Sequence, residues 1–219
     1  MDRKAFIVVS NMRVEEVDVI RNERDFCIVG NSFRQTGIRV RRSRVYATRQ
    51  EAEKHLATKG RRLIGWDEIL EGGLSPDATV MSWRGNAGGI EAAHQHHNVI
   101  MSPTSHCYID YYQLADRSKQ PACEGGFVSV SKMYSFDPIP QEIPEDEKKY
   151  IMGAQCNLWT HYADSPARAM YQILPRLAAM SEVQWLMPQQ KDFEAFKQRL
   201  SGIEKMYDKL GYNYCPTYE

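Results

Sequence analysis

Three tryptophans in this chain lie at the ends of short apolar runs, and each is followed directly by an acidic, basic or hydroxyl residue. They are Trp66, Trp83 and Trp159. An indole is a large rigid apolar face, and beside hydrogen-bonding groups it forms the lining that a sugar ring or an acetyl group needs. The pattern therefore predicts a ring of aromatic side chains around one pocket. Tryptophans in such positions can also be ordinary anchors of a hydrophobic core.

Four histidines lie close together in the sequence: His94, His96, His97 and His106. On a helix His94 and His97 would share one face, a spacing that can hold zinc. The same residues also suit the last turn of a helix, where a partly protonated imidazole interacts favourably with the helix dipole. We favour the second interpretation and expect no metal site and no cofactor.

The composition is that of a globular protein. Its 219 residues are 42% hydrophobic, which is enough to build a core. Lys plus Arg and Asp plus Glu both number 28, so the overall charge does not indicate a nucleic-acid partner. No stretch approaches the roughly 20 apolar residues of a membrane span, and we expect none. The five cysteines are odd in number and lack C-x-x-C spacing, which favours buried structural thiols.

Strand and helix patterns alternate from residue 49 onward. Strands are expected at residues 61–65, 79–82, 99–102 and 151–158, and helices at 50–58 and 88–97. Short strands separated by helices predict an α/β fold in which adjacent parallel strands are covered by helices. A long irregular stretch, residues 111–144, is rich in Pro, Gly and Ser. A loop of that length is usually functional or an excursion from the domain.

The last third of the chain is expected to be helical. Asp164 or Ser165 can cap a helix whose first turn holds Pro166, and Pro175 should kink or break that helix. A final helix carries apolar residues three and four positions apart from residue 193 to residue 210, and Gly211 should end it.

Four sequence blocks carry a specific pattern: residues 60–74 (GRRLIGWDEILEGGL), 80–85 (VMSWRG), 105–110 (SHCYID) and 174–182 (LPRLAAMSE). In this order they closely resemble the C-terminal half of the catalytic barrel of glycoside hydrolase family 20, the exo-acting β-N-acetylhexosaminidases. The resemblance covers residues 50–214 and implies strands five to eight of a (β/α)8 TIM-type barrel with a C-terminal helix. We therefore assign residues 49–219 to this half-barrel and leave residues 1–48 unassigned.

The resemblance also implies a mechanism and a set of site residues. In this family the acetamido carbonyl of the sugar attacks its own anomeric carbon, while an Asp orients the acetamido group and the adjacent Glu is the general acid. Three tryptophans, Trp66, Trp83 and Trp159, would wall the acetyl pocket. The catalytic residue expected in this chain is Tyr108, whose hydroxyl would donate to the acetamido oxygen. Asp110 and His161 would bind hydroxyls of the terminal sugar. The implied substrates are glycans that end in N-acetylhexosamine.

Two departures from the family pattern affect this prediction. The catalytic Asp-Glu pair of the family follows a His-x-Gly-Gly stretch, and no such stretch occurs in this sequence. Asp67-Glu68 resembles the pair superficially, but the family has this segment in addition to its catalytic pair. Where the family usually has Trp-x-Glu, this chain has His161, and a neutral imidazole cannot replace a carboxylate that accepts two hydrogen bonds.

The expected function is therefore that of a β-N-acetylhexosaminidase fragment that keeps the acetamido pocket and is inactive alone. The alternative is a non-catalytic glycan-binding or interaction module. Arg39, Arg41, Arg42 and Arg44 cluster just before the match begins, which suggests a truncated or frame-shifted reading of a longer gene or else a divergent extension. Half a barrel exposes two sheet edges, so self-association is a further possibility. The sequence has no recognisable secretory signal and leaves the compartment undefined.

Overall fold

The computed structural model describes residues 4–10, 26–28, 53–54, 56–58, 60–71 and 73–216. The chain divides into two compact units. Unit 1 comprises Met1–Met12, Met101–Pro140 and Met152–Glu219, and unit 2 comprises Arg13–Ile100 and Gln141–Ile151. The arginine cluster at 39–44 and the start of the helix predicted at 50–58 lie outside the described residues.

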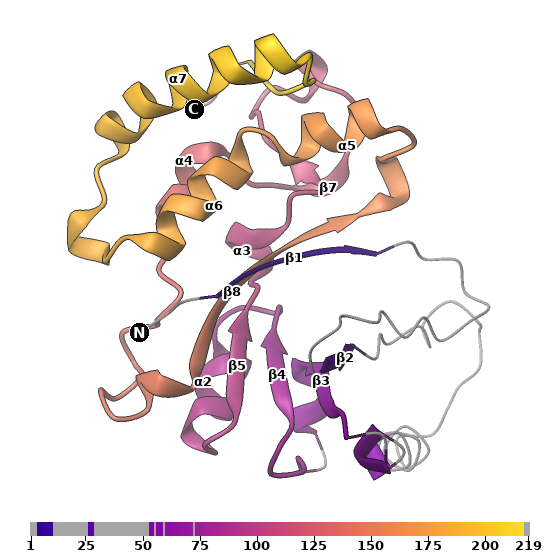
Figure 1. The fold of residues 1–219 in the computed structure, drawn as a ribbon, viewed down its shortest axis with the longest axis vertical. Coiled ribbons are helices and arrows are strands. Elements are labelled where there is room, and N and C mark those ends of the chain that lie inside the picture. The colour runs from indigo at the N-terminus through magenta and orange to yellow at the C-terminus, as the bar shows by residue number, and fades with distance from the viewer. Residues whose placement is uncertain are drawn as a thin grey trace. The chain divides into compact units, whose positions relative to one another are not determined.

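Unit 2 is built on short strands. They are β2 (Phe26–Ile28), β3 (Arg62–Trp66), β4 (Thr79–Ser82) and β5 (Asn98–Met101), in the spatial order β5-β4-β3-β2. The β2–β3 and β3–β4 pairs are parallel, and Figure 1 shows β4 and β5 pointing the same way. The 3-10 helix η1 (Asp67–Leu70) follows β3, α2 (Ala87–His94) lies between β4 and β5, and η3 (Lys148–Tyr150) ends the unit.

The residues of β4 explain why α2 packs closely in unit 2. All four residues of the strand are buried, and the Ser82 hydroxyl accepts a hydrogen bond of 2.9 Å from the Gly89 amide at the start of α2. A Cβ on Gly88 would lie 2.7 Å from Cβ of Asp67. Only glycine therefore allows this close approach of α2 to the loop after β3.

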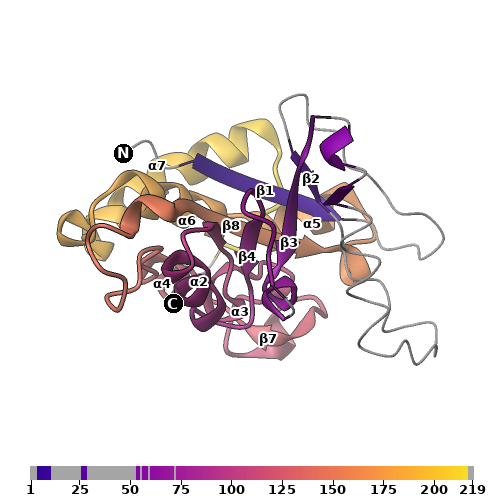
Figure 2. The same cartoon turned by 90° about the horizontal axis from the view of Figure 1, so that it is seen from below.

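Unit 1 contains β1 (Lys4–Ser10) and the long strand β8 (Ile151–Trp159), which pair in parallel from Lys4 and Gly153 to Ser10 and Trp159. Both views show these two strands running side by side (Figures 1 and 2). Between Met101 and Pro140 lie α3 (Thr104–Cys107), β6 (Tyr111–Tyr112), η2 (Arg117–Lys119), β7 (Glu124–Phe127) and α4 (Val130–Tyr134). After β8 come η4 (Thr160–Tyr162), α5 (Pro166–Ile173), α6 (Arg176–Trp185), η5 (Pro188–Gln190) and α7 (Phe193–Leu210).

The helices of unit 1 pack around aromatic and aliphatic side chains. The rings of Tyr134 and Phe196 stack with centroids 4.7 Å apart, and Met180 on α6 and Leu200 on α7 are fully buried. Burial of side chains of this size stabilises a fold by about 1.5 to 3 kcal/mol each. Within the described part of the chain, no helix is long and apolar enough to cross a membrane.

Most of the predicted elements are confirmed. The strands begin and end within about one residue of their predicted limits, because a short apolar run between turn or helix signals is a local feature of the sequence. The helix predicted to break at Pro175 is divided there into α5 and α6, and α7 ends at Gly211 with a left-handed φ of 68°. The irregular stretch at 111–144 is an excursion that forms the small parallel pair β6–β7. The unassigned residues 1–48 contain two strands, β1 and β2, that the sequence analysis did not predict.

Candidate functional site

Two of the predicted pocket tryptophans lie at one edge of the sheet in unit 2. Trp66 is the last residue of β3, and Trp83 directly follows β4. Because β3 and β4 are parallel neighbours, their carboxyl ends meet at the same edge. Both indoles are partly buried, as expected of side chains that wall a pocket.

The Asp67-Glu68 pair fixes the loop that carries Trp83. Asp67, which is 1% exposed, accepts hydrogen bonds from the backbone amides of Trp83 (3.1 Å) and Arg84 (3.2 Å) and from Nε of Arg84 (2.6 Å). Oε2 of Glu68 accepts a 3.0 Å bond from the Trp83 indole nitrogen. These contacts give both carboxylates a positioning role, since they orient the backbone and the ring of Trp83.

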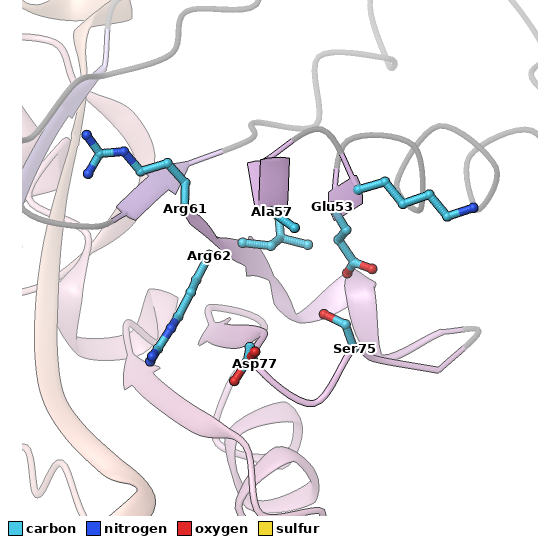
Figure 3. A pocket seen from close by; sticks show the side chains of 8 residues that line it. Glu53, Ala57, Arg61, Arg62, Ser75 and Asp77 are labelled. Carbon is cyan, nitrogen blue, oxygen red and sulfur yellow. The ribbon is translucent and has the colours of Figure 1, made fainter. Parts of the chain in front are cut away.

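A cavity of about 310 Å³ in unit 2 is not part of this edge. Its lining includes Arg61 and Arg62 at the start of β3 and Ser75 and Asp77 before β4, together with side chains of the preceding helical segment (Figure 3). It therefore opens at the amino ends of β3 and β4, whereas Trp66 and Trp83 follow their carboxyl ends. In α/β folds of this type, ligands bind at the carboxyl ends of strands, so we do not assign the substrate to this cavity.

In unit 1 the Tyr108 side chain is 6% exposed, and β8 holds its hydroxyl. Side chains of alternate residues point to the same face of a strand, which places Gln155, Asn157 and Trp159 together. The side chains of Trp159 and Asn157 hydrogen bond with the Tyr108 hydroxyl, and burial is the main reason that the pKa of this phenol lies well above its usual value. The phenol is consequently protonated at neutral pH and is held as an oriented O–H donor.

A buried polar network fixes the position of Asn157. Nδ2 of Asn157 donates to the Ser102 hydroxyl at 2.7 Å, and Oδ1 of Asn157 accepts from Gln155 Nε2 at 2.7 Å. The backbone amide of Ile109, the residue after Tyr108, donates to the Asn157 carbonyl at 2.9 Å. Asn157 is thereby fixed through both its side chain and its main chain, so it can hold the Tyr108 hydroxyl with little loss of freedom on binding.

Asp110 is 2% exposed, and its Oδ1 accepts no hydrogen bond from the residues that the structure describes. Burial raises the pKa of this carboxyl to about 7, while its own backbone amide and the Arg176 guanidinium oppose the shift. A buried acceptor without a partner costs about 1 to 3 kcal/mol. Asp110 is therefore well suited to accept a hydrogen bond from a ligand.

His161 in η4 is half exposed, and its Nδ1 lies 3.7 Å from Oε2 of Glu124. The Glu124 amide in turn donates to the Asp110 carbonyl at 3.0 Å. Glu124 thus lies between the two residues predicted to bind sugar hydroxyls. Glu124 could not be predicted as a site residue from the sequence, because it belongs to the irregular stretch and no motif surrounds it.

The clustered histidines have separate neighbours. Nδ1 of His94 lies 2.5 Å from Oε2 of Glu147 in unit 2, and His96 stacks on Tyr150. In unit 1 His106 stacks on Phe136, and burial lowers its pKa to about 4. Among the residues that the structure describes, no three His, Cys, Asp or Glu side chains form a group that could hold a metal ion.

The structure therefore gathers the predicted residues into two groups. Trp66 and Trp83 share the edge in unit 2, and Tyr108, Asp110, Trp159 and His161 lie in unit 1. That the two groups form one pocket remains a prediction. Asn157 is a second residue that the sequence analysis missed, although its position two residues before Trp159 could have revealed it, since alternate residues share a strand face.

Comparison with solved structures places the fold in a known class. The chain superposes with a TM-score of 0.75 on a family 20 β-N-acetylhexosaminidase from Streptomyces coelicolor, at 22% identity and over 88% of this chain and 39% of that one. With an exo-β-N-acetylglucosaminidase from Vibrio harveyi, solved in complex with N-acetylglucosamine, the TM-score is 0.64 at 29% identity, over 75% of this chain and 26% of that one. The chain has a partial TIM-type α/β fold.

The sequence comparisons identify the family. Residues 29–188 match the family model described as glycosyl hydrolase family 20, catalytic domain, and the chain belongs to that family. It is 48% identical over 166 residues to a β-hexosaminidase of Porphyromonas gingivalis, covering 75% of this chain and 21% of the relative. With a β-N-acetylhexosaminidase of Cellulomonas fimi it shares 30% identity, covering 71% of this chain and 32% of the relative. The chain thus spans about a fifth to a third of the length of these curated relatives.

Proposed function

We propose that this chain forms the part of a β-N-acetylhexosaminidase catalytic domain that binds the acetamido group and the outer hydroxyls of a terminal N-acetylhexosamine. The observation that carries this proposal is the buried Tyr108 hydroxyl, held by Trp159 and Asn157. The names of the relatives and the N-acetylglucosamine in the Vibrio harveyi structure support the substrate class. In this assignment β3, β4, β5 and β8 are strands five to eight of the barrel.

The proposed chemistry is substrate-assisted hydrolysis with retention of the anomeric configuration. The acetamido carbonyl oxygen attacks the anomeric carbon of its own sugar while the glycosidic C–O bond breaks and the leaving oxygen takes a proton from the general acid. Water then adds to the anomeric carbon of the oxazolinium-like intermediate, reopens the ring to the acetamide and gives up a proton. Trp159, which holds the Tyr108 hydroxyl in unit 1, packs against the acetyl methyl group and excludes water. The resemblance to the family assigns the same role to Trp66 and Trp83. The Tyr108 hydroxyl donates to the carbonyl oxygen as its charge changes, and a donor already oriented in the folded protein requires no reorganisation at that moment.

The outer hydroxyls of the sugar are assigned to the group around Asp110. The buried Oδ1 of Asp110 accepts a hydrogen bond from one sugar hydroxyl. The half-exposed side chains of His161 and Glu124 form a pair in the same unit. Glu124 supplies a carboxylate where the chain has His161 in place of the family glutamate. We therefore include Glu124 in the proposed site.

The general acid is the component that this sequence does not provide. The His-x-Gly-Gly-Asp-Glu stretch of the family is absent from it, and Asp67 and Glu68 are engaged with the Trp83 loop. Loss of general-acid help costs about 10² to 10⁴-fold in rate. We therefore propose that this polypeptide binds the sugar and does not hydrolyse it at a significant rate unaided.

A binding experiment tests the proposal directly. Saturation-transfer NMR with N-acetylglucosamine and with glucose should give a signal for the first sugar only, since glucose lacks the acetamido group. Tyr108→Phe should weaken that signal, whereas Tyr212→Phe, which removes the same atom from an exposed ring in unit 1, should leave it unchanged. Equal signals for the two sugars would contradict the acetamido pocket.

A non-catalytic glycan-binding module is the second candidate, and the absent acid motif is the observation that favours it. The two functions differ in turnover. If the site is catalytic, a chimera that joins this chain to the N-terminal part of a family 20 catalytic domain should hydrolyse a chromogenic N-acetylglucosaminide. Binding without turnover in the chimera would instead support recognition alone.

A further inference from the structure

Arg176 is the first residue of α6 and is completely buried. A guanidinium carries five N–H groups and remains charged in proteins, so burying it without partners would be very costly. Here the side chain makes five hydrogen bonds, all to main-chain carbonyl oxygens. The acceptors are the carbonyls of Ile109, Tyr111, Val128 and, twice, Gln172.

Two of these acceptors flank Asp110. Ile109 precedes it, with its carbonyl 2.5 Å from Nη2 of Arg176, and Tyr111 follows it, with its carbonyl 3.0 Å from Nη1. The Val128 carbonyl, just after β7, lies 3.0 Å from the same Nη1 atom. The guanidinium therefore fixes the backbone on both sides of Asp110 and ties it to the strand that begins with Glu124.

The same guanidinium acts on the charge of Asp110. Since Asp110 is buried, desolvation disfavours its carboxylate form, and the positive charge of Arg176 opposes that effect. Among the residues that the structure describes, the other titratable groups that interact with Asp110 do not supply a positive charge. They are Glu124 on β7, Tyr111 on β6, Tyr108 after α3 and Cys123 before β7.

Building on the sugar-binding function proposed above, we propose that Arg176 is a positioning residue for Asp110. It holds Asp110 in place through the Ile109 and Tyr111 carbonyls and favours the carboxylate form, which can accept a hydrogen bond from a sugar hydroxyl. Arg176 touches no sugar in this proposal. Its effect on binding passes entirely through Asp110.

The first experiment measures Asp110 without any sugar. In the full chain labelled with ¹³C at aspartate carboxyls, Asp110 is assigned by the signal lost in Asp110→Asn. Arg176→Met should move the titration midpoint upward by about 1 to 3 pH units, the usual effect of a neighbouring opposite charge. Arg176→Lys keeps the charge and should leave the midpoint near its original value. Arg199→Met removes an equal charge from the exposed side chain that pairs with Glu182 and should not move it.

The second experiment measures the affinity for N-acetylglucosamine at neutral pH by calorimetry. If Arg176→Met raises the midpoint by one unit from about 7, the ionised fraction at pH 7 falls from about one half to about one tenth, and the apparent affinity falls about fivefold. The wild-type affinity should recover in Arg176→Met at higher pH. A variant that had only lost packing would show no such recovery.

The outcomes separate this inference from the proposed function. A shifted midpoint with no sugar binding by any variant would uphold the action of Arg176 on Asp110 and refute the sugar site. Sugar binding with an unchanged midpoint in Arg176→Met would overturn the inference alone. If Arg176→Met does not fold, Arg176→Lys remains decisive. A rise of about 1 to 3 pH units in the Asp110 midpoint of Arg176→Lys, which keeps the positive charge, would show that this charge does not control Asp110.

Discussion

The indole nitrogen of Trp83 donates a 3.0 Å hydrogen bond to Oε2 of Glu68, fifteen residues earlier in the chain. This bond fixes the rotation of a ring that would otherwise turn freely about its side-chain torsions. It also explains why an acidic pair follows Trp66. Each carboxylate accepts from the next loop, Glu68 from the ring of Trp83 and Asp67 from the backbone.

Glu68→Ala should loosen the Trp83 ring, and Glu68→Gln should retain an acceptor for the indole. A net hydrogen bond contributes about 0.5 to 1.5 kcal/mol, so we expect N-acetylglucosamine affinity to fall by about 2- to 10-fold in the alanine variant and to change little in the glutamine variant. Calorimetric titration measures both. If this chain alone hydrolysed a chromogenic N-acetylglucosaminide and Glu68→Gln abolished that turnover, Glu68 would be an acid instead.

Asp67→Ala should lower the stability of unit 2. The substitution leaves two amides, those of Trp83 and Arg84, without their acceptor, and an unsatisfied buried group costs about 1 to 3 kcal/mol. Urea denaturation measures the free energy of unfolding. Asp77→Ala, at an exposed turn of the same unit, is the matched control and should cost far less. Equal losses would show that the Asp67 bonds do not stabilise the loop.

Tyr108→Phe and Trp83→Ala should affect kcat and KM differently in a chimera that joins this chain to the N-terminal part of a family 20 catalytic domain. Tyr108→Phe keeps the ring and removes the positioned donor, so the loss should fall mainly on kcat, by roughly 10- to 1,000-fold, with a smaller rise in KM from the lost ground-state hydrogen bond. Trp83→Ala opens the acetyl pocket in the ground state as well and should also raise KM. Steady-state kinetics on one N-acetylglucosaminide decides this. An unchanged kcat in Tyr108→Phe would reduce that residue to a packed aromatic.

Asp110 gives the stability of unit 1 a specific dependence on pH. Burial raises its pKa in the folded protein from 3.8 to about 7, so the folded state holds its proton over a range in which the unfolded state has released it. This contribution favours the folded state at low pH and is lost as the pH rises from about 4 to about 7. The wild type should therefore lose stability relative to Asp110→Asn across that range. Urea denaturation of both proteins tests it, and the opposing effect of His106 cancels in the difference. If the free energies of unfolding of the two proteins changed equally with pH, the raised pKa of Asp110 would be contradicted.

His161→Glu restores the family residue but places a second carboxylate beside Glu124, which lies 3.7 Å from the imidazole. Because like charges repel, the single substitution should improve sugar affinity less than the double substitution His161→Glu with Glu124→Gln. A double-mutant cycle measured by calorimetry gives the coupling between the two positions. Additive effects would show that Glu124 and residue 161 act independently.

The local pattern of the chain was enough to locate most of the elements. α7 follows from apolar residues three and four positions apart and from Gly211, which adopts a left-handed φ of 68°. The ends of β3 and β4, and hence the common edge for Trp66 and Trp83, follow from short apolar runs that alternate with helices. These features could be predicted because neighbours along the chain produce them.

The partners of the polar site residues could not be predicted in this way. Asp110, Glu124 and Arg176 are brought together by chain segments up to 66 residues apart, and nothing in their own surroundings in the sequence indicates it. The local motif was also compatible with Asp67 and Glu68 as acid and base, whereas the fold makes them acceptors for the Trp83 loop. A side chain's type fixes which hydrogen bonds it can make. Which partner it meets, and how far burial moves its pKa, depend on packing between distant segments.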